Sequence, residues 1–110
     1  MNKKRIYSRY STTAMELIGK AIQLGRKERK LTAQDLAGRA AISRGTLLKI
    51  EKGDMHCEVG LVFELATLVG IKLFDADDKQ LTMDIDRLND KIALLPKSVR
   101  SGKQVVKDDF

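Results

Sequence analysis

The chain has 110 residues, of which 43% are apolar and 33% are charged, so its size suits one small domain with an appendage. This composition excludes a wholly disordered protein, and no apolar run approaches the roughly 20 residues that a membrane-spanning helix needs. The basic N-terminus lacks the apolar core of a signal peptide, and the single cysteine, Cys57, excludes an intrachain disulfide. We therefore expect a cytoplasmic protein without a membrane segment.

The net charge of +6 is unevenly divided along the chain. Residues 1–53 carry 13 Lys and Arg against 4 Asp and Glu, a balance of +9, whereas residues 54–95 carry 4 against 9, a balance of −5. A basic first half joined to an acidic second half favours a surface that meets a polyanion such as nucleic acid. Basic surfaces without such a partner are equally common, so charge alone leaves both interpretations open.

The first predicted helix covers residues 13–30 and follows a basic N-terminal arm, residues 1–12. Apolar and small residues recur at steps of three and four, as in an amphipathic helix that buries one stripe. Cations gather in its last turn, where they suit the negative end of the helix dipole. The residues of the predicted stripe are Ala14, Leu17, Ile18, Ala21, Ile22 and Gly25.

Two short capped helices follow, over residues 32–40 and 43–52. Thr32 and Asp35 have the spacing of a capping box, and Ser43 is a typical N-cap residue. Two helices of roughly two turns with only a few residues between them are typical of a helix-turn-helix. The short connection predicts that they cross steeply.

The second half is predicted to contain a helix over residues 58–69 and a C-terminal helical segment within residues 75–95. Between them, residues 71–74 alternate apolar and polar, which allows a short strand that a second copy of the chain would have to pair. The last helix, over residues 81–95, has a narrow apolar seam that suits either a dimer contact or packing on its own domain. The seam consists of Leu81, Ile85, Leu88, Ile92 and Leu95. Residues 96–110 are expected to be a flexible tail.

The sequence contains no pattern typical of an enzyme, a metal site or a cofactor site. His56 and Cys57 are neighbours, but a nucleophile pair needs an orienting third group, and two soft ligands are too few for zinc. The acidic run at residues 75–78 lacks the glycine and the glutamate of a calcium loop. We therefore expect a protein that is not an enzyme and that holds no metal or cofactor.

The helix over residues 43–52 is the candidate recognition helix. In a helix-turn-helix, the start of the second helix reaches base edges, while nearby cations and helix ends hold phosphates. Arginine and lysine suit the guanine acceptors, threonine suits thymine, and glycine lets the backbone approach DNA. The alternative is that these charges only solvate the surface. The predicted base contacts are Arg44, Gly45, Thr46 and Lys49, and the predicted phosphate contacts are Lys27, Lys30, Gln34, Arg39, Ser43 and Lys52.

Residues 18–71 resemble the phage-repressor-type (XRE/Cro) helix-turn-helix family in the motifs "LTAQDLA", "AISRGTLLKIEKG" and "LATLVGI". The resemblance implies an all-α, phage-repressor-like domain of four to five helices, here residues 13–74. It also implies an ion pair between Arg26, late in the first helix, and Glu51, which ends the recognition helix. The chain departs from the family at Ala33, where a phosphate-binding glutamine is usual, and at Ala41, where the turn glycine is usual.

The flanking segments extend the resemblance. "YSRY", "GLVFELATLVGIKLFDAD", "LLPKSVR" and "DDF" are similar to segments of HipB-type antitoxins, which are encoded beside HipA-like serine/threonine kinase toxins. The resemblance implies a bacterial, nucleoid-associated homodimer that represses its own operon at a palindromic operator and binds the kinase toxin. A stand-alone regulator and a protein-interaction adaptor that no longer binds DNA are the alternatives. The expected dimer contacts are Ile71, Leu73, Phe74, Leu81, Ile85, Leu88 and Ile92.

Overall fold

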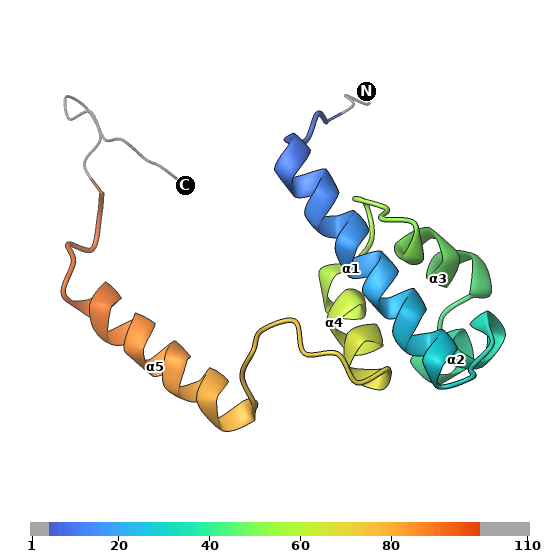
Figure 1. Ribbon diagram of the computed structural model, residues 1–110. Helices are drawn as coiled ribbons and strands as arrows, with labels where there is room; N and C mark the ends of the chain where they lie inside the picture. Colours follow the sequence, from blue (N-terminus) through green and yellow to red (C-terminus); the bar gives the residue numbers. More distant parts are fainter. Residues whose placement is uncertain (1–4, 100–110) are drawn as a thin grey trace. The chain divides into compact units, whose positions relative to one another are not determined.

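The computed structural model describes residues 5–99 and is all-α, as the sequence predicts. The chain divides between Asp75 and Ala76 into two units, each of which is described by itself (Figure 1). Residues 1–4 of the predicted arm and residues 100–110 of the predicted tail lie outside the described residues. The helices are α1 (Arg9–Glu28), α2 (Ala33–Ala40), α3 (Arg44–Glu51), α4 (Val59–Leu68) and α5 (Asp78–Ala93).

Helix α1 begins four residues before the predicted start, inside the segment expected to be an arm. Ser8 is its N-cap, and the Ser8 side chain accepts a hydrogen bond from the Ser11 backbone N–H at 3.2 Å. Thr12 strengthens this first turn by donating its hydroxyl to the Ser8 carbonyl at 3.1 Å. Polar capping residues, rather than apolar periodicity, therefore set where α1 begins.

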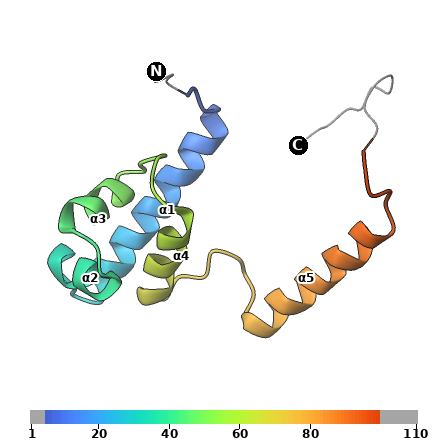
Figure 2. The same cartoon turned by 180° about the vertical axis from the view of Figure 1, so that it is seen from behind.

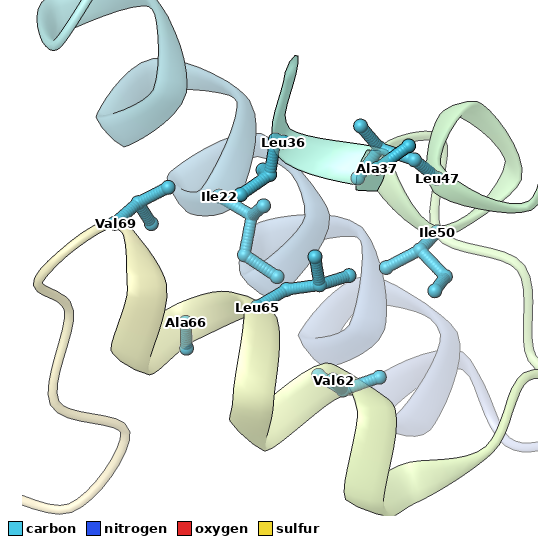
Figure 3. Close-up of a cluster of buried hydrophobic side chains, with 9 residues drawn as sticks. All are labelled: Ile22, Leu36, Ala37, Leu47, Ile50, Val62, Leu65, Ala66 and Val69. Carbon is cyan, nitrogen blue, oxygen red and sulfur yellow. The ribbon is translucent and has the colours of Figure 1, made fainter. Parts of the chain in front are cut away.

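The first unit has its hydrophobic core at the centre of α1–α4. Helix α3 contacts both α1 and α2, and α4 contacts both α1 and α2, so the four helices enclose one core (Figures 1 and 2). Leu65 of α4 lies between Ile22 of α1 and Ile50 of α3, and all three are fully buried (Figure 3). The core consists of Ile22, Leu36, Ala37, Leu47, Ile50, Val62, Leu65, Ala66 and Val69.

The buried stripe of α1 includes the predicted Ile22 and Gly25 but differs from the prediction elsewhere. Leu17, which apolar spacing places inward, is 68% exposed, whereas Gly19 and Arg26, outside the predicted stripe, are buried. A Cβ on Gly19 would lie 2.5 Å from the carbonyl oxygen of Ile50, so only glycine lets the end of α3 approach α1 this closely. The prediction for Leu17 was wrong because hydropathy does not register a stripe made of glycine and a paired charge.

The segment 71–74 forms no strand, and the part of the chain that the structure describes contains none. The Ile71 N–H donates to the Ala66 carbonyl at 2.8 Å, which closes the end of α4. Ile71 and Leu73 pack against the core of their own unit, and the ring of Phe74 stacks on Phe63 with centroids 6.1 Å apart. The alternation that suggested a pairing strand comes instead from irregular chain folded onto the core.

Helix α5, in the second unit, begins three residues before its predicted start and ends at Ala93. Asp77 is its N-cap and accepts a hydrogen bond from the Gln80 N–H at 2.9 Å. None of its residues is buried. Within this unit Leu81 is half-buried, and Ile85, Leu88 and Ile92 of the predicted apolar seam are each more than half exposed.

Candidate nucleic-acid interface

Helices α2 and α3 are joined by a three-residue turn, and local hydrogen bonds cap both helices. At the start of α2, the Thr32 side chain accepts from the Asp35 N–H at 3.0 Å, and Asp35 accepts from the Thr32 N–H at 2.9 Å. This is the predicted capping box. The hydrogen bond from the Thr32 backbone N–H is the main reason that the pKa of Asp35 is lowered.

The turn reverses direction at Ala41, which ends α2 in the left-handed conformation with φ 57° and ψ 44°. The Ile42 N–H donates to the Ala37 carbonyl at 3.0 Å. Ser43 then starts α3, accepting a hydrogen bond from the Thr46 N–H at 3.0 Å. Alanine thus occupies the position where glycine would adopt the same backbone without steric cost.

Helix α3 presents two different faces. Leu47 and Ile50 are fully buried on the inner face. Arg44, Gly45 and Lys49, three of the four predicted base contacts, are exposed on the outer face. The outer face can therefore reach a groove without disturbing the core.

Thr46, the fourth predicted base contact, is half-buried. Its hydroxyl accepts a hydrogen bond from the Ser43 hydroxyl at 3.0 Å. The Ser43 hydroxyl oxygen in turn accepts from the Thr46 N–H. Thr46 and Ser43 are therefore part of the helix cap as well as candidate DNA contacts, a role that sequence spacing assigned to Ser43 only.

Arg26 of α1 and Glu51 of α3 form a buried, bidentate ion pair. The Arg26 Nε donates to Glu51 Oε2 at 2.7 Å, and a terminal guanidinium nitrogen donates to Oε1 at 2.9 Å. The other terminal nitrogen donates to the Leu31 carbonyl at 3.1 Å, so the guanidinium also holds the α1–α2 connection. The hydrogen bond with Glu51 raises the pKa of Arg26. This pair fixes the end of α3 against α1.

The predicted phosphate contacts are all exposed. Lys27 lies in the last turn of α1, Lys30 follows that helix with a positive φ of 56°, and Lys52 is the C-cap of α3. Gln34 lies in the first turn of α2 and Arg39 in its last turn. They therefore lie at the ends of α1, α2 and α3.

Arg29 has a structural role that the helical spacing does not indicate. Its guanidinium donates a hydrogen bond to the Val69 carbonyl at the C-terminal end of α4. Cations at a helix C-terminus satisfy free carbonyl groups and suit the dipole. Gly70, which follows α4 with φ 77°, marks the end of that helix in the sequence. Nothing in the sequence indicates that Arg29 lies close to this helix end.

His56 and Cys57 are held by local contacts. The Cys57 thiol donates to the Asp54 carbonyl at 3.2 Å, and burial raises the pKa of the thiol. A raised pKa opposes the thiolate that a nucleophile or a metal ligand requires. The His56 ring meets the Tyr7 ring edge to face, with centroids 6.1 Å apart.

None of the helices within residues 5–99 has the length and apolar character needed to cross a bilayer. No protein-family model matches the chain, and no solved structure matches it significantly. An uncharacterized HTH-type transcriptional regulator of Methanocaldococcus jannaschii is 40% identical over 45 residues, which are 41% of this chain and 68% of the relative. That match, together with the two capped helices and the turn between them, shows that the chain belongs to the HTH-type transcriptional regulators.

Proposed function

We propose that the protein is a sequence-specific DNA-binding repressor that inserts α3 into the major groove. One observation carries this proposal: the outer face of α3 holds exposed Arg44, Gly45 and Lys49, while its inner face is fixed by buried packing and by the ion pair of Glu51. A groove-reading helix needs such a division between a free face and a fixed one, because recognition depends on a held orientation.

Each outer residue has a distinct task in this proposal. Arg44 and Lys49 donate to the O6 and N7 acceptors of guanine. Thr46, whose hydroxyl is engaged with Ser43, offers its methyl group to thymine. Gly45 lets the first turn of α3 approach the DNA backbone. The phosphates on both sides of the groove are held by Lys27, Lys30, Gln34, Arg39, Ser43 and Lys52.

The Arg44→Ala variant tests this assignment. Losing a bidentate guanine contact should cost about 1–3 kcal/mol of operator affinity and relax the preference at one base pair. The measurement is a titration of wild type and variant against the operator and against operators changed at single positions. Glu64→Ala, an exposed residue of α4 outside the proposed DNA and dimer contacts, is the control and should leave affinity unchanged. Equal affinity and selectivity of Arg44→Ala and wild type would overturn the assignment.

We further propose that the protein acts as a homodimer on a palindromic operator, with half-sites about one helical turn (roughly 34 Å) apart. Two short recognition helices bind more tightly and selectively than one because the second binds as part of the same complex. The exposed seam of α5 and the exposed ring of Phe74 supply apolar surface for this contact. The proposed contacts of the seam are Leu81, Ile85, Leu88 and Ile92, and the half-buried Ile71 and Leu73 complete the set.

The finer proposal is an antitoxin that represses its own operon and binds a HipA-like kinase toxin. Its support is the similarity of the flanking segments to HipB-type antitoxins. Co-expression with the product of the adjacent gene, followed by purification through a tag on the present chain, tests it directly. A kinase-like protein that co-purifies and changes operator affinity supports an antitoxin. Operator binding without any co-purifying neighbour indicates a stand-alone regulator, and weak binding without sequence preference indicates an adaptor.

A further inference from the structure

Helix α5 carries an apolar stripe that begins at the half-buried Leu81 and is exposed from Ile85 onward. Leu81, Ile85, Leu88 and Ile92 follow one another at steps of four, three and four residues, and Leu95 continues the spacing after the helix ends. Ile85 is 56% exposed, Leu88 58% and Ile92 63%, so the stripe is uncovered. An average spacing of about 3.5 residues is typical of a helix that packs against one other helix.

The charges beside the stripe select the orientation of that other helix. In a heptad lettered a to g, the apolar residues of a helix pair occupy positions a and d. Ile85 and Ile92 are at position a here, which places Asp84 and Lys91 at position g, on one flank of the stripe. If two copies of α5 pair antiparallel, with Ile85 opposite the partner's Leu88, the g positions face one another. Asp84 then lies opposite the partner's Lys91, and the two-fold axis repeats this pair.

A parallel pair lacks this complementarity. In a parallel pair, Asp78 is at position a and lies beside the partner's Asp78. Asp84, at position g, faces the partner's Asn89 at position e. Residues 77–86 carry four Asp and one Lys, whereas residues 87–97 carry three Lys and Arg and one Asp. A parallel pair therefore aligns the acidic halves, and an antiparallel pair aligns each acidic half with a basic one.

Within one chain, Asp84 has a local partner, Arg87, that it can exchange for a cation of another chain. Arg87 forms a salt bridge with Asp84 at 3.2 Å, but the two side chains are 57% and 40% exposed. Exposed pairs one turn apart hold weakly, so Asp84 is free to bind another cation. The apolar hollow at the other end of α5, lined by Ile92, Leu95, Pro96, Ser98 and Val99, lies where an antiparallel partner places its first turn.

We propose that a second copy of this chain covers the α5 stripe, and that the two helices pair antiparallel with Asp84 on the partner's Lys91. The proposal deepens the dimeric regulator proposed above and rests on it for its biological meaning. The two-fold axis passes near residues 86 and 87, at the middle of α5. The two helix-turn-helix units are then joined through opposite ends of the paired helices.

Charge exchange tests the pairing in solution with the full chain and without DNA. Asp84→Lys alone and Lys91→Asp alone each place like charges together at two sites, so each should weaken the dimer about tenfold. Mixed together, the two variants should form heterodimers, because each variant's altered residue then meets its complement. Native mass spectrometry of chains differing in tag mass counts the heterodimers.

Asp86→Lys and Lys79→Asp are the matched control, since they make the same exchange seven residues apart at exposed positions away from the stripe. Their mixture should give the statistical fraction of heterodimers. A statistical fraction from the Asp84→Lys and Lys91→Asp mixture as well would overturn the antiparallel pairing. A preference for heterodimers in both mixtures would also overturn it, since net charge alone would then explain the result.

Leu88→Glu tests whether the stripe is the interface at all. Leu88 is not buried in the single chain, so the variant should keep the unfolding transition of α1–α4 while sedimenting as a monomer. A variant that stays dimeric would overturn the proposal, and so would a wild type that stays monomeric near millimolar concentration. Because neither measurement involves DNA, a failure here is separate from a failure of Arg44→Ala.

Discussion

At the scale of a single residue, Gly45 is a position where the proposed DNA binding can be changed without disturbing the fold. A Cβ at this position would lie 3.9 Å from the Ser43 Oγ, which is an ordinary contact, so the fold leaves room for a larger residue. Alanine would also favour the helix. The fold therefore does not account for glycine here, whereas the proposed close approach of α3 to the DNA backbone would.

We accordingly expect Gly45→Ala to raise or preserve thermal stability while lowering operator affinity about tenfold, the effect of roughly 1.4 kcal/mol of crowding against the sugar-phosphate backbone. Thermal unfolding and an operator titration of the same samples measure both effects. Gly60→Ala is the control, because Gly60 lies in α4 and an added methyl group there would meet open space. Unchanged affinity in Gly45→Ala would show that DNA does not come close to this position.

The turn at Ala41 stores a small amount of backbone strain. A residue with a Cβ in the left-handed region costs about 1–2 kcal/mol. Glycine avoids this strain, but the gain is only partial because glycine loses more conformational entropy on folding. Ala41→Gly should therefore stabilise the protein by about 0.5–1 kcal/mol in urea unfolding. Ala40→Gly, one residue earlier in α2, should destabilise it by a similar amount. A loss of stability in Ala41→Gly would contradict the left-handed turn.

At the scale of elements, the Arg26–Glu51 pair holds the recognition helix in place. Replacing Arg26 with methionine leaves the Glu51 carboxylate buried without its partner, and such a change costs about 3–5 kcal/mol. Urea unfolding of Arg26→Met should show this loss, whereas Arg39→Met, an exposed arginine of α2, should change stability by less than about 0.5 kcal/mol. Equal effects of the two variants would mean that the pair does not support the fold.

The capping box of α2 predicts a pH dependence. The lowered pKa of Asp35 means that its carboxylate stabilises the fold above the pKa of the unfolded chain, about 3.9. That contribution is lost as the pH falls through the lower, folded-state pKa. The stability difference between wild type and Asp35→Ala should therefore be largest near neutral pH and shrink in acid. A difference that does not change with pH would contradict the hydrogen-bonded carboxylate.

Capping residues and helical spacing together predicted the order of the helices from the sequence. Thr32, Asp35 and Ser43 act within a few residues of the chain, so their effects can be read locally. The burial of Gly19 could not be read locally, since Gly19 is buried only because the end of α3 lies against it. Arg29 likewise meets Val69 across 40 positions, a distance that no local pattern encodes. Of the predicted site, the ion pair was anticipated through family resemblance rather than through spacing.

At the scale of the whole molecule, the basic first half should govern how binding depends on salt. Each cation that neutralises a phosphate releases counterions and adds close to one to the slope of log affinity against log salt. Lys27→Gln should therefore weaken binding to all sequences alike and reduce the slope by about 1. Lys79→Gln removes the same charge from the first turn of α5, outside the basic first half, and should leave the slope unchanged. Equal slopes for Lys27→Gln and wild type would remove Lys27 from the interface.

The two faces of α3 also bear on how such a regulator diversifies. Packing constrains Leu47, Ile50 and Glu51, so mutations there are removed by loss of folding before they can alter recognition. Positions 44, 45 and 49 are free of that constraint, and as the proposed base contacts they would let descendants of a duplicated gene acquire new operators. The same freedom suits engineering: a library randomised at these three positions should yield mutually orthogonal repressors that share one scaffold and one melting temperature range.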